Sequence, residues 1–379
     1  MESRVAAGLG SLAAHEWDAL VPDGHPFLRH AFLAGLEQTH CVGGDSGWES
    51  AHVLLSDQRG LAAAAPTYLK SHSYGEFVFD FAWAQGYARA GLAYYPKLVV
   101  AVPFTPATGP RLLVRPDLDR ATASSGLLAA LEVLAADRGA SSIHVLFPDQ
   151  ADGATLAAAG WLERHDCQFH WYNRGYASFD HYLAGFTAEK RKKARRERRR
   201  VAEMGIAFET WTGDQIPGDR LDAVYALHRD TFLRHGHEPY LTRAFFSHAA
   251  RSCGPAFIVK AALWRGELVA CAVFFRSQDA LYGRYWGAAA DFHSLHFETC
   301  YHQGIEYCIE AGLARFEPGT QGEHKVARGF EPTRTRSAHR IFNARLRAAI
   351  ADYLTRERRS VDAYAAAVRE HVPFRKAPG

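Results

Sequence analysis

The densest group of chemically useful side chains lies in the segment Glu317–Arg328 (EPGTQGEHKVAR). Four polar residues fall there within six positions: Glu323, His324, Lys325 and Arg328. A proline and two glycines just before them predict a loop at a strand end, where catalytic groups commonly lie on a rigid scaffold. Glu323 or His324 could accept a proton, and Lys325 or Arg328 could hold a phosphate or an acidic substrate. The alternative is a solvated turn of mixed charge.

A second polar cluster lies in the N-terminal half of the chain. It comprises Lys70, His72, Tyr74, Glu76 and Asp80. If the strand is unbroken, the alternation of side chains places the first four on one face and the neighbouring phenylalanines on the other. A polar row on an inner strand favours a cleft in which these residues bind and orient a substrate. The alternative is a sheet surface that faces solvent.

Two further sets of candidate binding residues lie in the C-terminal half. Arg284 and Tyr285 stand in an aromatic-rich strand, where an arginine is a good ligand for an anion. His296 and Glu298 follow at the start of a predicted helix and could face a substrate, although an exposed polar helix face is the alternative. The segment Asp291–Ser294 opens this helix with its serine as the predicted N-cap, either a phosphate-binding start or an ordinary cap. No HExxH pair is present, so no metal site is predicted.

An internal repeat predicts the elements that position these residues. In the C-terminal half the pattern predicts three strands, Phe257–Leu263, Leu268–Arg276 and Ala280–Gly287. The matching strands of the N-terminal half are Ala51–Leu55 and Leu61–Lys70. A helix follows in each copy, at Ser124–Arg138 and Ser294–Ala311, and each helix ends at a glycine.

The repeat continues after these helices. Each copy has a short strand, a short helix and a last strand: Ser142–Phe147, Ala154–Ala159 and Cys167–Tyr172, then Ala314–Glu317, His324–Arg328 and Arg334–His339. This order resembles the GNAT N-acyltransferase fold in tandem, and a chance similarity between two unrelated α+β domains is the alternative. We therefore predict an α+β or α/β chain with mixed sheets, whose two GNAT-like domains span 1–175 and 176–379. A helical tail is predicted at 341–372 in the second domain.

Composition excludes several classes of protein. With 48% hydrophobic and 22% charged residues, the 379-residue chain is neither disordered nor membrane-like, and it is long enough for about two domains. No transmembrane segment is predicted, because every apolar stretch is too short or too charged to span a bilayer. The charged residues 1–30 do not resemble a secretory signal. The six cysteines show no CxxC spacing and are too sparse for a disulfide scaffold, so a reduced cytoplasm is the predicted compartment.

The run Lys190–Arg200 (KRKKARRERRR) concentrates positive charge. It contributes +8 to a formal net charge of +3, which leaves the rest of the chain at −5. The pattern predicts a docked helix over 183–204 with cations on its outer face. The residues predicted to contact nucleic acid are Lys190, Arg191, Lys192, Lys193, Arg195, Arg196, Arg198 and Arg199. Such a helix could engage the phosphates of a tRNA acceptor stem with salt-dependent affinity. An anionic lipid or polymer surface and a merely solubilising helix are the alternatives.

Six strings together are similar to the FemAB-like predicted N-acyltransferases, often labelled peptidoglycan biosynthesis/recognition proteins. They are His72–Asp80, Tyr94–Val114, Gln168–Asn173, Leu281–Ala288, Leu295–Glu306 and Gly322–Pro332. The resemblance covers roughly residues 14–374 and implies the tandem GNAT fold, in agreement with the repeat. Within this family the Fem branch moves amino acids from aminoacyl-tRNA to peptidoglycan precursors, and an inserted helical element serves the tRNA.

The resemblance implies an enzyme that transfers an acyl or aminoacyl group from an activated donor to an amine, such as an envelope precursor, in a cleft between the domains. Aminoacyl-tRNA is the favoured donor, because neither copy shows the glycine-rich signature with which GNATs hold the pyrophosphate of coenzyme A. An acyl-CoA-dependent N-acetyltransferase acting on a small amine is one alternative. A non-catalytic module that binds nucleic acid or membrane is the other. No tightly bound cofactor is expected, and the sequence does not predict the oligomeric state.

Overall fold

The computed structural model describes residues 1–290, 292, 294–320 and 322–375, and the chain forms two compact units. The first unit consists of Met1–Asp166 with Arg334–Ala363, and the second of Cys167–Thr333 with the segment from Tyr364 onward. These units differ from the predicted domains at 1–175 and 176–379. Residues 334–363 come late in the chain, yet they belong to the first unit because their strand pairs with a strand of that unit.

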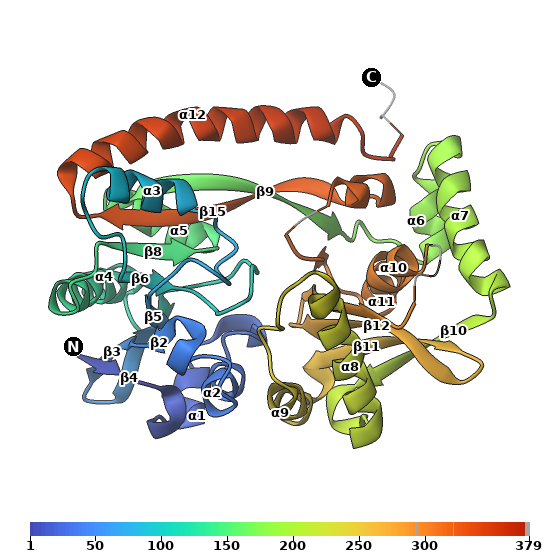
Figure 1. The fold of residues 1–379 in the computed structure, drawn as a ribbon, viewed down its shortest axis with the longest axis horizontal. Coiled ribbons are helices and arrows are strands. Elements are labelled where there is room, and N and C mark those ends of the chain that lie inside the picture. The colour runs from blue at the N-terminus through green and yellow to red at the C-terminus, as the bar shows by residue number, and fades with distance from the viewer. Residues whose placement is uncertain (291, 293, 321, 376–379) are drawn as a thin grey trace. The chain divides into compact units, whose positions relative to one another are not determined.

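The first unit contains strands of two sheets (Figure 1). One sheet is antiparallel in the order β1-β3-β4-β7, and five strands of the other follow the order β15-β8-β6-β5-β2, in which β6 and β8 are parallel. The strands are β1 (Glu2–Ala6), β2 (Trp48–Ser50), β3 (His52–Asp57), β4 (Gly60–Ala65), β5 (Thr67–Lys70), β6 (Lys97–Val100), β7 (Leu113–Val114), β8 (Ser142–Leu146) and part of β15 (Glu331–Ile341). The predicted strand Leu61–Lys70 is in fact two strands of different sheets, because Pro66 between them has no N–H to donate.

The helices of the first unit cover the apolar faces of its sheets. They are α1 (Ala14–Asp18), α2 (His30–Gln38), α3 (Phe81–Arg89), α4 (Arg120–Asp137), α5 (Gln150–Ala158) and the first part of α12 (Ala344–Arg369). Helix α4 buries Leu127 and Leu131 in a core that includes Val53 and Ile143. It begins earlier than the sequence predicted because Asp119 caps it by accepting a hydrogen bond from the Thr122 amide.

The second unit is built on strands in the order β10-β11-β12-β13-β14-β9, antiparallel except for the parallel pair β13 and β14. The strands are β10 (Ile206–Thr212), β11 (Phe257–Trp264), β12 (Glu267–Arg276), β13 (Ala280–Ala288), β14 (Arg315–Glu317) and part of β9 (Leu162–Tyr172). The helices are α6 (Phe179–Ala184), α7 (Ala188–Glu203), α8 (Gly218–Arg234), α9 (Arg243–Cys253), α10 (Leu295–Phe297) and α11 (Gln303–Glu310). A π-helical turn, η6 (Glu298–His302), joins α10 to α11, and a 3₁₀ helix, η7 (Glu323–Arg328), follows β14.

The last strand of each repeat completes the sheet of the other unit. Trp171 and Tyr172 of β9 pair with β14 in the second unit. The segment Ser337–Ile341 of β15 pairs with β8 in the first unit. Both copies of the predicted element order are therefore present, and the predicted fold class, two tandem GNAT-like modules with mixed sheets, is confirmed.

Two local features of the fold bear on function. The predicted basic helix over 183–204 is two helices, α6 and α7, which are separated at Gly185–Thr187. The predicted tail at 341–372 is the single helix α12, of which residues from Tyr364 onward belong to the second unit. In the described part of the chain, no helix combines the length and the apolar character needed to cross a membrane.

Candidate functional site

The candidate site lies where two parallel strands of the second unit part. Strands β13 and β14 pair from Ala280 and Arg315 to Tyr282 and Glu317. There β14 ends, whereas β13 continues to Ala288. A cavity of about 90 Å³ occupies this place. Its lining comes from β12, from β13, from the helix after β13 and from the residue that follows β14: Ala272, Val273, Phe274, Gly283, Arg284, Tyr285, Trp286, His296, Cys300, Tyr301 and Pro318.

A β-bulge brings Arg284 to the cavity. On the neighbouring strand β12, Val273 pairs with Tyr285 and Phe274 pairs with Gly283, so Arg284 is the additional residue of β13. The guanidinium carbon of Arg284 lies 5.4 Å from the centroid of the Tyr285 ring. Both residues predicted from this strand therefore line one cavity, and the bulge has no signature in the sequence.

His296 enters the cavity from α10. Burial, together with the positive charges of Arg328 and Lys325 and with His324, lowers the pKa of His296 to about 4. The imidazole is therefore neutral at neutral pH and packs edge-on against Trp286, with 5.2 Å between ring centroids.

The start of this helix differs from the prediction. Ser294 stands at the predicted N-cap position, but it adopts a left-handed backbone conformation with φ of 66° and its side chain makes no capping hydrogen bond. Asp291, the other end of the predicted cap segment, lies outside the described residues.

Glu298 points away from the cavity, toward α7. It is 3% exposed, and its Oε1 accepts hydrogen bonds from Arg198 Nε at 3.1 Å and Gln303 Nε2 at 2.8 Å. The predicted pair His296 and Glu298 is therefore divided between two environments. The alternative of an exposed polar helix face is wrong too, because His302, one turn further, is only 1% exposed.

The structure separates the two predicted proton-handling residues of η7. His324 Nε2 lies 2.9 Å from the hydroxyl of Tyr301, which lines the cavity. Although His324 is exposed, partial desolvation and the charges of Lys325 and Arg328 lower its pKa, so it is neutral at neutral pH. Glu323 is exposed and accepts a hydrogen bond from the Tyr364 hydroxyl at 2.7 Å. His324 thus reaches the cavity through Tyr301, which was not among the predicted site residues.

The two cations of η7 are buried and contact other groups of the unit. Lys325 is 2% exposed, its Nζ donates to the Gly319 carbonyl at 2.7 Å, and burial lowers its pKa to about 7. Arg328 is 5% exposed and donates to Glu197 Oε1 at 2.8 Å. Their predicted role as anion ligands stays a prediction, and in the structure they hold the turn in place.

The predicted nucleic-acid ligands of α7 fall into two groups. Those whose side chains are exposed are Lys192, Lys193, Arg195, Arg196 and Arg199, whereas Lys190, Arg191 and Arg198 are partly buried. Arg198 faces inward and forms ion pairs with Glu298 at 3.1 Å and Glu306 at 2.7 Å. The outer face of α7 therefore carries a cluster of exposed cations, and its inner face is anchored by charge pairs.

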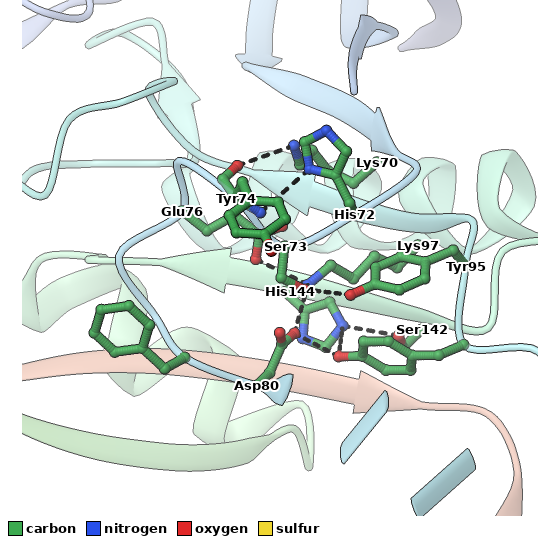
Figure 2. A network of polar contacts seen from close by, with 12 residues as sticks. Lys70, His72, Ser73, Tyr74, Glu76, Asp80, Tyr95, Lys97, Ser142 and His144 are labelled. Carbon is green, nitrogen blue, oxygen red and sulfur yellow. Dashed lines mark hydrogen bonds and ion pairs between the residues drawn. The ribbon is translucent and has the colours of Figure 1, made fainter. Parts of the chain in front are cut away.

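The predicted cluster of the first unit has a different geometry from the expected polar row. Strand β5 ends at Lys70, so His72, Tyr74 and Glu76 lie in a loop and do not share a strand face. Figure 2 shows that Glu76 and Asp80 converge instead on Lys97 of β6. His72 is half-buried and Tyr74 is 65% exposed. They join the network only at its edge, because the Tyr74 carbonyl accepts a hydrogen bond from Lys70 Nζ at 3.3 Å and the Tyr74 amide donates to His72 Nδ1 at 3.2 Å (Figure 2).

Lys97 is the centre of this network, and sequence reasoning missed it. Its side chain is fully buried, its Nζ donates to Glu76 Oε2 and Ser73 Oγ at 2.8 Å each, and it also contacts Asp80 Oδ2. Although burial opposes the charge on Lys97, the two carboxylates outweigh burial and raise its pKa. The Asp80 carboxylate also accepts a hydrogen bond from Tyr94. The available signal was a lysine at the head of the apolar run KLVVAV.

Two further titratable groups of this network, Glu76 and Lys70, have strongly shifted pKa values. Burial raises the pKa of Glu76 to about 7, and burial lowers the pKa of Lys70 to about 7. Lys70 lies directly opposite Lys97 in the β5–β6 register, with its Nζ 4.0 Å from the Trp48 ring centroid. The two neighbouring lysines therefore have pKa values shifted in opposite directions.

The first unit fills the place that corresponds to the cavity of the second. Its parallel strands β6 and β8 pair up to Val100 and Val145, and then the chain itself closes the gap. Gly109 forms a bridge with Pro148, and the fully buried Arg111 donates to the carbonyls of Leu146 and Ala107. The gap beyond β6 and β8 is thus bridged by the chain itself, and a cavity of about 190 Å³ in the first unit lies to one side of it, lined by Phe147 at the end of β8 and by residues of β9, β15 and α12.

Two modules of this element order define a tandem GNAT-like protein. The chain belongs to the FemAB-like family, described as peptidoglycan biosynthesis/recognition, whose model matches residues 8–376. The predicted family is therefore confirmed. A search of curated proteins found no match.

Several solved structures share the fold. The crystal structure of FemX has a TM-score of 0.56 at 11% identity, over 93% of this chain and 100% of that one. A conserved protein of unknown function from Bacteroides thetaiotaomicron has a TM-score of 0.54 at 10% identity, over 90% of this chain and 99% of that one. The structure of L-PGS from Bacillus licheniformis has a TM-score of 0.50 at 13% identity, over 94% of this chain and 98% of that one. At such identities these similarities establish the fold alone.

Lys97→Met should strongly destabilise the first unit, because it leaves two carboxylates buried without their cation. We expect a loss of about 3–5 kcal/mol in the free energy of unfolding, measured by urea denaturation at pH 7. Lys192→Met, an exposed lysine of α7, is the control. A loss equal to that of the control would contradict the assigned role of Lys97.

Lys70→Met should have the opposite effect. The folded-state pKa of Lys70 is about 7, below the ordinary 10.5, so below pH 7 the folded protein must bury a charged amine. As pH rises from 7 toward 10.5, that cost disappears. We expect the variant to be more stable than wild type by about 1–4 kcal/mol at pH 6 and by less at pH 10. Equal differences at the two pH values would show that Lys70 does not titrate in this way.

Proposed function

We propose that the chain is an N-acyltransferase that moves an aminoacyl group from aminoacyl-tRNA to an amine of a peptidoglycan-type envelope precursor. The observation that carries this proposal is the polar cavity at the parting of β13 and β14, in a unit that also presents exposed cations on α7. The family description supports the acceptor class, and the tandem GNAT-like fold supports acyl transfer.

The cavity supplies a place for the reacting carbonyl. An acyl group held between parted strands meets backbone N–H donors, which can stabilise the oxyanion that develops when an amine attacks. Arg284 adds a cation at the mouth of the same space. In the first unit the corresponding place is filled around Arg111, so we assign the donor to the second unit.

Proton transfer is assigned to Tyr301 and His324. The amine nitrogen forms a bond to the carbonyl carbon, and the ester bond to the ribose oxygen breaks. The Tyr301 hydroxyl accepts the amine proton while it donates its own to His324 Nε2, 2.9 Å away. Burial raises the pKa of Tyr301, which keeps the hydroxyl protonated, and the neutral His324 can accept the proton and then return it to the leaving ribose oxygen.

The remaining predicted residues take no part in the proposed proton transfer. Glu323 and Tyr364 are hydrogen-bonded to each other on the surface of the unit, so neither is assigned to proton transfer. In the first unit, His72 and Tyr74 are the least buried members of the predicted cluster, and their predicted role in binding a substrate stays a prediction. A cytoplasmic location stays a prediction.

His324→Gln should lower kcat/KM for aminoacyl transfer by about 10²- to 10³-fold, because it removes the proton acceptor. The measurement is transfer of a radiolabelled amino acid from tRNA to a precursor amine, with acetyl-CoA as the competing donor. Glu323→Gln, the neighbouring exposed residue, is the matched control and should stay close to wild type. In the wild type the rate should fall only below pH 6.5, because the pKa of His324 is lowered from that value. Transfer from acetyl-CoA but not from aminoacyl-tRNA would contradict the proposed donor.

Neutralising the outer face of α7 should weaken tRNA binding in a salt-dependent way. For the triple variant Lys192→Gln, Lys193→Gln, Arg196→Gln, we expect the slope of log K against log salt to become shallower by about 2–3. The test is the binding constant for labelled tRNA, measured by fluorescence anisotropy at salt concentrations from about 50 to about 300 mM. The control neutralises three exposed arginines of α12: Arg345, Arg356 and Arg359. Equal slopes for wild type, variant and control would exclude α7 as the tRNA contact.

A further inference from the structure

The basic helix α7 has a buried row that includes a carboxylate. Ala194, Glu197 and Val201 are 3%, 8% and 1% exposed and lie at helical spacing on the inner face. A charged group between two buried apolar residues requires a partner that offsets its desolvation. Such a partner must come from an element packed against α7.

Glu197 finds its partners outside its own helix. Its Oε1 accepts a hydrogen bond from Arg328 at 2.8 Å, and its Oε2 lies 3.5 Å from His302 Nε2. Burial favours the neutral acid, but the His302 contact and the charge of Arg328 outweigh burial and lower the pKa of Glu197. The observed contacts of Glu197 therefore lead to η7 and η6 and not to the basic residues of its own helix.

Arg328 connects Glu197 to the turn that carries His324. Its second terminal nitrogen donates to the backbone carbonyl of His324 at 2.7 Å. Its guanidinium carbon lies 3.5 Å from the centroid of the Phe297 ring. The backbone carbonyl of Arg328 accepts a hydrogen bond from the Tyr182 hydroxyl of α6 at 2.6 Å. The helix pair α6–α7 therefore holds η7 at two points, through Glu197 and through Tyr182.

The turn fits this attachment closely. The residue after Arg328 is Gly329, whose φ of 85° lies in the left-handed region. A Cβ at that position would lie 1.9 Å from the Tyr182 hydroxyl oxygen, so a side chain there would displace the tyrosine. The tyrosine hydroxyl and the turn are thus packed directly against each other.

We infer that Glu197 is a positioning residue that joins the polyanion-binding helix to the turn holding the proton acceptor. Its carboxylate holds Arg328, and Arg328 holds the main chain at His324. The exposed cations of α7 belong to the same helix as Glu197. The Glu197 carboxylate therefore fixes the position of a bound acceptor stem relative to the reacting end of the donor. This inference rests on the proposed function for its catalytic meaning, whereas the physical link within the unit is independent of it.

Hydrogen exchange tests the link without any assay of transfer. In the full-length protein, Glu197→Gln should speed the exchange of the backbone amides of residues 323–330 by about tenfold or more, because a hydrogen bond between charged groups is lost. Glu203→Gln is the matched control, since Glu203 lies on the same helix, is 66% exposed in its side chain and lies 3.6 Å from Arg199. Tyr182→Phe removes the second attachment without leaving a buried charge and should also speed this exchange. Exchange that is equal in Glu197→Gln, Tyr182→Phe and the control would overturn the link.

Kinetics test the positioning role. In Glu197→Gln we expect kcat to fall by about tenfold to a hundredfold with little change in the affinity for tRNA. In Glu197→Asp, which keeps a carboxylate, we expect kcat to fall less. The acid limb of the pH profile should move to lower pH, because Arg328 without its carboxylate lowers the pKa of His324 further. A variant that only destabilised the fold would not move this limb. Unchanged kcat and an unchanged limb would exclude the positioning role.

The two proposals fail in different ways. If neither aminoacyl-tRNA nor acetyl-CoA supports transfer but exchange in residues 323–330 still rises in Glu197→Gln, the link stands and the proposed function falls. If transfer from aminoacyl-tRNA is found and Glu197→Gln matches Glu203→Gln in every measurement, the proposed function stands and the link falls.

Discussion

A charged side chain that leaves water needs an opposite charge or enough hydrogen-bond acceptors, and this requirement shapes the interior of both units. In the first unit, Lys97 on a central strand draws the loop carboxylates of Glu76 and Asp80 inward. In the second unit, Glu197 draws Arg328 against α7. Since breaking such a pair costs more than an apolar replacement of the whole pair, these contacts fix where loops lie more than they add to stability.

The two modules share an order of elements but differ where their parallel strands end. In the second unit a bulge, four aromatic side chains and the neutral His296 line a small cavity. In the first unit the chain after β6 turns back and places the Arg111 guanidinium among backbone carbonyls. A duplicated framework can thus keep the same strands while one copy closes the space that the other leaves open, which allows the copies to diverge in role.

The sequence predicted the regular elements better than the site. Alternating and helical patterns located the strands and helices of both repeats, because burial of one face leaves a periodic trace. The row from Lys70 to Glu76 was misplaced because β5 ends at Lys70. Sequence periodicity does not predict the path of the loop that follows a strand. Lys97, Tyr301 and Glu197 were missed for a related reason: each owes its role to a partner distant in sequence, as Glu197 and Arg328 are 131 positions apart.

The exchange of last strands has a consequence for how the chain is made. The sheet of the first unit needs β15, whose His339 meets His144 of β8 across 195 positions of sequence. During synthesis the N-terminal module therefore emerges with an open sheet edge at β8, and this edge stays uncovered until the chain has been extended by the 195 positions that separate His144 from His339. Such late closure between distant segments slows folding and exposes an aggregation-prone strand in the interval, so nascent chains of this design depend on protection that a module with its own final strand would not require.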